Sequence, residues 1–168
     1  MKDTPIIAGI ALLAVAIGVY FFLSGDVKNS SPASVSESQT SAVAVPFTPL
    51  VSGTRSTIAE RVNYFITSST QLNELWKLVD AKGQPPKVDF TKEAVIAVFA
   101  GQQPTGGYAI QVSKIVDSGA RLVSITIQKP DDSCKPKVVV TMPYEIVTIP
   151  ATTLPLAHED ILTTVPCP

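Results

Sequence analysis

An unbroken apolar run near the N-terminus constrains the organisation of this chain more than any other feature. Residues 6–23, IIAGIALLAVAIGVYFFL, contain no charged residue and no Asn, Gln or His. At about 1.5 Å per helical residue, the run can cross most of a bilayer core of about 30 Å. A cleaved signal peptide is the alternative, but only Lys2 precedes the run and no A-x-A-like site follows it. The sequence therefore predicts a retained membrane helix, with residues 1–23 as the anchor.

The residues after the run have the composition of a tether followed by one soluble domain. Residues 24–44 contain seven serines and no aromatic residue, which is typical of a flexible linker. Residues 45–168 are long enough for a single domain. This part carries 11 Lys and Arg against 11 Asp and Glu, so it is neutral. A nucleic-acid partner, which requires a basic surface, is not expected.

One amphipathic helix is predicted at the start of the domain. Ser68 followed three residues later by Gln71 matches a capping box, and Gly83 before two prolines marks the stop. The apolar positions between these signals repeat at helical spacing, so one face of the helix should be buried. They are Leu72, Leu75, Trp76 and Val79.

The rest of the domain has the pattern of strands. Residues 94–100, AVIAVFA, are apolar throughout and predict a central strand that is covered on both faces. Further strands are predicted at residues 61–67, 108–112, 123–127, 138–141 and 145–149. Short connections favour antiparallel pairing. The predicted class is α+β: an antiparallel, curved or sandwich-like sheet of six to seven strands with one packed helix, preceded by the transmembrane helix.

A glycine-rich segment, GQQPTGGY, joins two of these predicted strands. It resembles a hairpin turn, because Pro and Gly occur in most such turns. Its polar and aromatic residues also suit a rigid recognition loop, in which Gln103 and Thr105 point to solvent and the Tyr108 ring is partly buried. The candidate partner-binding residues are Gln102, Gln103, Pro104, Thr105, Gly106, Gly107 and Tyr108.

Several motifs in a fixed order carry a resemblance to a known family. The chain has Leu-x-x-Leu-Trp at 72–76, Val-Asp-Phe at 88–90, Pro-Thr-Gly-Gly-Tyr at 104–108 and MPYEIVTIP at 142–150. This set resembles the C-terminal domain family of the protease-complex subunit PrcB. The resemblance implies a non-catalytic bacterial domain outside the cytoplasm. The family is named for a lipoprotein that associates with and stabilises a surface protease. Here an apolar helix stands in place of the lipid-bearing Cys of that subunit.

The same loop is similar to a second kind of protein. Chagasin-type cysteine-protease inhibitors carry an Asn-Pro-Thr-Thr-Gly-Tyr loop, and here Gln103 replaces the Asn and Gly106 the second Thr. Inhibition of a protease through residues 103–108 is therefore the alternative function.

The two cysteines, Cys134 and Cys167, match no zinc or redox spacing. In an exported domain a disulfide between them is the natural expectation, and two unpaired buried thiols are the alternative. Closing a loop of about 33 residues would stabilise the fold by about 3 to 4 kcal/mol on the chain-entropy estimate.

No catalytic constellation can be assembled from the sequence. His158, the sole histidine, precedes Glu159 and Asp160 in a Pro-rich tail that is expected to be a solvated loop. No nucleophile-elbow sequence, metal motif or nucleotide loop is present. No enzymatic activity, metal or cofactor is therefore expected, and a hydrolase of unknown type is a third alternative.

The predicted function is that of a membrane-anchored, extracytoplasmic domain that binds another protein as an accessory or stabilising subunit. Each of the three candidate functions predicts a different structural feature. An enzyme should have a cleft with convergent polar groups of shifted pKa, an inhibitor a protruding loop, and an accessory subunit an exposed apolar patch or open strand edge.

Overall fold

Eight strands and one short helix make up residues 41–166, the part of the chain that the computed structural model describes. Their order is β1 (Val43–Ala44), β2 (Thr48–Gly53), β3 (Arg61–Ile66), α1 (Ser69–Trp76), β4 (Glu93–Ala100), β5 (Ala109–Asp117), β6 (Arg121–Pro130), β7 (Tyr144–Pro150) and β8 (Leu156–Val165).

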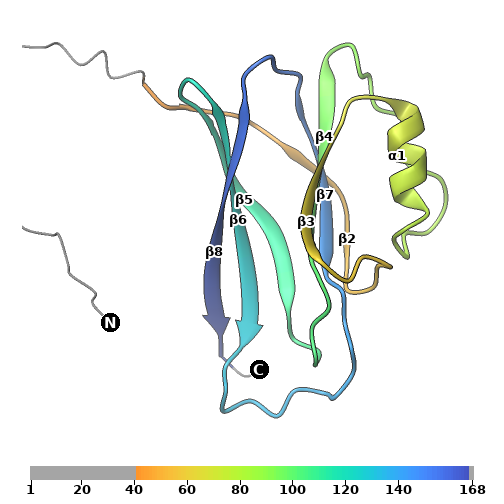
Figure 1. Cartoon of the computed structure of the whole chain (residues 1–168), viewed down its shortest axis with the longest axis vertical. Coiled ribbons are helices and arrows are strands. Elements are labelled where there is room, and N and C mark those ends of the chain that lie inside the picture. Colours follow the sequence, from red (N-terminus) through yellow and green to blue (C-terminus); the bar gives the residue numbers. More distant parts are fainter. Residues whose placement is uncertain (1–40, 167–168) are drawn as a thin grey trace, which may run out of the picture. The chain divides into compact units, whose positions relative to one another are not determined.

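The strands form two four-stranded sheets rather than one. Sheet A has the order β1-β5-β6-β8, and sheet B has the order β2-β7-β4-β3. Figure 1 shows the two sheets face to face, with α1 on the outer side of sheet B. The predicted α+β class with six to seven strands is therefore wrong. The described residues form a mainly β domain, because the single helix has eight residues and serves only as a cover.

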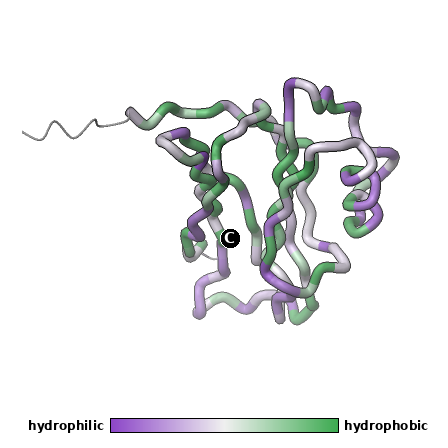
Figure 2. Tube along the Cα trace, turned by 45° about the horizontal axis from the view of Figure 1, so that its top comes forward, coloured by the Kyte–Doolittle hydropathy of each residue, from purple (hydrophilic) through white to green (hydrophobic). Residues whose placement is uncertain are grey.

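Strand β4 is the centre of the domain, as its apolar sequence predicts. Seven of its eight residues are buried. Alternate residues face opposite sides: Ile96 and Val98 join the core between the sheets, while Val95 and Phe99 join a second core under α1. Figure 2 shows hydrophobic residues along the central strands and both hydrophilic and hydrophobic ones on the helix.

The helix begins where its capping signal predicts. The Ser68 hydroxyl accepts the N–H of Gln71, and the Gln71 side chain accepts the N–H of Thr67. The predicted apolar stripe is buried, with Leu72 and Trp76 packed against sheet B. The helix ends at Trp76, before the last residue of the predicted apolar stripe. That residue, Val79, lies in the loop after the helix and is buried.

Strands β1, β2 and β8 are absent from the sequence prediction, which assigned the residues of β1 to the linker, and the predicted strand at 138–141 does not form. From that segment only Thr141 pairs, in an isolated bridge to Gln103. Strand β8 pairs with β6 in parallel, whereas an antiparallel sheet was expected. The segment around His158 is thus a strand rather than a loop. A parallel pair needs a long crossover, and here residues 131–155, which include β7, supply it.

The predicted membrane helix at 6–23 and the greater part of the predicted linker lie outside the described residues. Within residues 41–166, no helix is both long and apolar enough to cross a membrane.

Candidate protein-binding site

The predicted recognition loop is a connection between the sheets and not a hairpin turn. Strand β4, before the loop, belongs to sheet B, and β5, after it, belongs to sheet A. The loop therefore carries the chain from one sheet to the other at one end of the domain. Sequence alone could not distinguish the two cases, because both need a Pro- and Gly-rich turn.

Gly101 allows the loop to begin against the segment before β3. Its φ is +75°, and a Cβ atom here would lie 2.9 Å from the Ala59 carbonyl oxygen. The next residue, Gln102, donates its N–H to that same oxygen at 2.8 Å. Backbone conformation and space both require glycine at this position.

Internal hydrogen bonds hold the middle of the loop. Gln103 and Thr141 exchange backbone hydrogen bonds of 2.8 and 3.0 Å, and the Gln103 side-chain amide donates to the Ala100 carbonyl at 3.0 Å. The Thr141 hydroxyl donates to the Thr105 carbonyl at 3.0 Å. Gln103 and Thr105 are half-buried, in contrast to the expectation that both point to solvent. The amide of Gln103 therefore stabilises the loop itself.

The remaining loop residues divide by exposure. Gln102, Pro104 and Gly107 are exposed, while Gly106 and Tyr108 are half-buried. Of the paired glycines, only Gly107 has a positive φ, +88°. Whether this loop contacts a partner stays a prediction. Cys134 lies within the described residues and Cys167 outside them, so their disulfide also stays a prediction.

A second candidate surface, not predicted from the sequence, is a cleft between edge strands β3 and β8. We call it the β3–β8 cleft. Its volume is about 440 Å³, and residues from both sheets line it. Residues 61–65 form one wall and residues 156–158 the other, over a floor of Ile96, Val123 and Ile125.

Strand alternation explains which side chains face this cleft. Asn63 and Phe65 lie opposite Val98 and Ile96, whose side chains point between the sheets. Opposite residues in a ladder share a face, so Phe65 also points between the sheets. It remains 39% exposed because the cleft is open. The sequence offered one signal for this surface, the apolar Phe65 on the face of β3 that also carries Arg61 and Asn63. This signal indicates a cleft only if β3 is an edge strand, which the sequence does not reveal.

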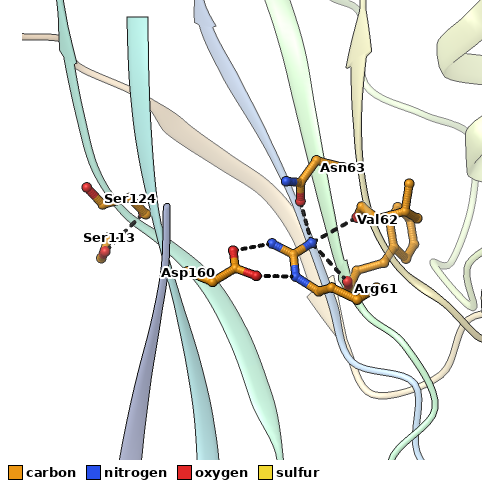
Figure 3. A network of polar contacts seen from close by, with 7 residues as sticks. Arg61, Val62, Asn63, Ser113, Ser124 and Asp160 are labelled. Carbon is orange, nitrogen blue, oxygen red and sulfur yellow. Dashed lines mark hydrogen bonds and ion pairs between the residues drawn. The ribbon is translucent and has the colours of Figure 1, made fainter. Parts of the chain in front are cut away.

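An ion pair joins the two walls. The Arg61 Nε donates to the Asp160 carboxylate at 2.9 Å, and Nη2 donates to its other oxygen. Arg61 Nη1 also donates to the Asn63 side chain and to the Val62 carbonyl (Figure 3). The pair links β3 of sheet B to β8 of sheet A. Both side chains are partly exposed, so it contributes about 1 kcal/mol or less.

The polar residues of β8 alternate between the cleft and the outer face of sheet A. Glu159 accepts a hydrogen bond from Ser124 at 2.7 Å. His158 and Asp160 lie opposite Val123 and Ile125 and so face the cleft, whereas Glu159 alternates to the outer face of sheet A. Within residues 41–166, no group of three or more His, Cys, Asp or Glu residues could hold a metal ion.

The described groups with shifted pKa values lie away from the cleft. Burial raises the pKa of Glu145, whose carboxylate accepts the N–H of Val112 at 2.6 Å and so joins β7 to β5. Burial also raises the pKa of Tyr144 to about 12, beside Asp80. Hydrogen bonds lower the pKa of three exposed or half-buried carboxyl groups. They belong to Asp89, Asp117 and Asp131.

The fold and this surface define a mainly β, two-sheet domain with an apolar cleft open at one pair of strand edges. Residues 94–150 match the PrcB C-terminal family, which confirms the resemblance over β4 to β7. The match covers 57 of the 168 residues and includes the loop, whereas β3 and β8 lie outside it. No curated protein and no solved structure matches the chain significantly.

Proposed function

We propose that this domain binds another protein as a non-catalytic accessory subunit of an envelope protease complex. The observation that carries the proposal is the β3–β8 cleft, an apolar surface that lies between two open strand edges. Exposed apolar patches and free strand edges are the surfaces through which proteins bind other chains. The match to the PrcB C-terminal family supports a protease complex as the setting.

The chemistry of the cleft favours binding over catalysis. Its floor is aliphatic, and the shifted titratable groups of the described residues lie elsewhere. An active site would instead bring polar groups of shifted pKa together in its cleft. The inhibitor alternative has less support, because the side-chain amide of Gln103 donates a hydrogen bond to the Ala100 carbonyl inside the loop.

The first test is co-purification of the tagged full chain from its native envelope. Residues 1–44 fused to an unrelated domain provide the control, because this fusion keeps the apolar run and the whole predicted linker. We expect a protease to be enriched with the full chain and not with the control, as measured by quantitative mass spectrometry. Equal recovery with both proteins would contradict the proposal, and enrichment of a non-protease alone would contradict its protease part.

The proposal includes a location outside the cytoplasm, with the domain held by the apolar run at 6–23. We expect protease added to intact cells to digest residues 45–168 and to leave a cytoplasmic marker protein whole. The measurement is an immunoblot against the domain before and after lysis. Digestion that occurs only after lysis would reverse the proposed topology.

A further inference from the structure

Strands β3 and β8 both have one free edge. Strand β3 ends sheet B and pairs only with β4, and β8 ends sheet A and pairs only with β6. Both edges lie on the same side of the domain, because the two strands line one cleft and the Arg61–Asp160 pair joins them. A free edge presents unpaired backbone groups to which another chain can add a strand.

Sheet B lacks a strand opposite β8. Strand β5 packs across β7 and β4, so the strands that follow it in sheet A, β6 and β8, lie toward the β3 edge of sheet B. None of the ten residues of β8 is buried, although the residues it pairs with on β6 include the core residues Val123 and Ile125. A strand added beside β3 would lie over this uncovered inner face.

The backbone of β3 is oriented to accept such a strand. Ala100 donates its N–H to the Pro143 carbonyl, on the β7 side of β4. Because N–H directions alternate along a strand, the N–H groups of Phe99 and Ala97 point toward β3 and meet Val62 and Tyr64. By the same alternation, the N–H and C=O groups of Asn63 and Phe65 point away from β4, to the free edge.

The lining of the cleft specifies the chemistry of the added strand. The floor is Ile96, Val123 and Ile125, and Leu156 is 40% exposed on the β8 wall. The two charged groups that meet across the cleft, Arg61 and Asp160, neutralise each other. A charged side chain brought against the aliphatic floor would lose its hydration without gaining a partner of opposite sign there.

We propose that β3 binds an extended, uncharged segment of the partner protein as an additional strand of sheet B. Alternate side chains of this segment are apolar and fill the β3–β8 cleft. At about 3.3 Å per residue, a segment of about six residues would match the length of β3. This inference rests on the proposed function, since it locates the surface that the accessory domain uses.

The experiment compares Phe65→Lys with Leu78→Lys in the full chain. The two side chains are equally exposed, at 39% and 38%, but only Phe65 lines the cleft. We expect Phe65→Lys to lower recovery of the co-purified partner by about tenfold or more and Leu78→Lys to leave it unchanged. Both variants should keep the melting temperature of the wild type, because both sites are on the surface.

Hydrogen exchange on the purified wild-type complex gives a second measurement. We expect binding to slow exchange of the Asn63 and Phe65 amides, with no comparable effect at Leu78. Wild-type recovery with Phe65→Lys, or protection confined to another surface, overturns the inference and leaves the proposed function intact. The amides of Asn63 and Phe65 could instead be protected already in the isolated full chain and exchange freely after residues 1–40 are cleaved off. In that case residues 1–40 of the same chain occupy the edge of β3, and the inference fails. If the wild-type chain recovers no partner, the proposed function itself fails.

Discussion

Replacing Gly101 with alanine is expected to lower the free energy of unfolding by about 4 kcal/mol, from strain in the left-handed region together with overpacking. The residue has a φ of +75°, and its Cβ would lie 2.9 Å from two backbone atoms, the Ala59 carbonyl oxygen and the Arg61 nitrogen. Backbone atoms cannot rotate away as a flexible side chain can, so the end of β4 or the start of β3 would have to move.

Gly83→Ala is the matched control for this prediction. Gly83 has a nearly identical φ of +79°, but nothing lies within 4 Å of its Cβ position. This variant should lose only about 1 kcal/mol, from backbone strain alone. Urea unfolding followed by the fluorescence of Trp76, the only tryptophan of the chain and a buried one, measures both values. Equal losses in the two variants would show that the contact at Gly101 relaxes without cost.

Replacing Arg121 with methionine is expected to lower the free energy of unfolding by about 2 kcal/mol, because it removes the buried partner of an ion pair with the half-buried Asp117. The Arg121 side chain is 5% exposed and binds both carboxylate oxygens of Asp117 at 2.8 Å. It also donates to the Pro150 carbonyl and so ties β6 of sheet A to the end of β7 in sheet B. The variant leaves the Asp117 carboxylate and the Pro150 carbonyl without this partner.

The decrease in the free energy of unfolding caused by Arg121→Met should depend on pH. The hydrogen bonds from Arg121 hold the pKa of Asp117 below its ordinary value of 3.8. The stability gained from this shift is present in full above the unfolded-state pKa and disappears as the pH falls through the lower folded-state value. The difference between wild type and variant should therefore be constant near neutral pH and should shrink below pH 3.8.

Urea unfolding at several pH values measures this dependence. Lys77→Ala is the control, because its ion pair with Glu74 is 66% exposed on both sides and should contribute within about 0.5 kcal/mol. A loss in Arg121→Met that stays the same at low pH would contradict the assigned role of Asp117.

Local sequence patterns predicted the elements whose side chains are buried. The apolar run of β4 identified a strand covered on both faces, and Ser68 with Gln71 located the start of α1. The motifs at 104–108 and 142–150 lie within residues 94–150, which match the PrcB C-terminal family, whereas the motifs at 72–76 and 88–90 lie outside this match. Each of these predictions follows from burial or capping, which leave a pattern within a few residues of sequence.

Only the tertiary structure decided how the strands are divided between two sheets and where the domain is open. Strand β8 buries none of its residues and is held by its backbone pairing with β6, so it leaves no hydrophobic pattern in the sequence. The loop from Gly101 to Tyr108 has the same composition whether it closes a hairpin or crosses between sheets. The β3–β8 cleft exists because these two strands are edges on the same side of the domain, and pairing between distant segments determines which strands become edges.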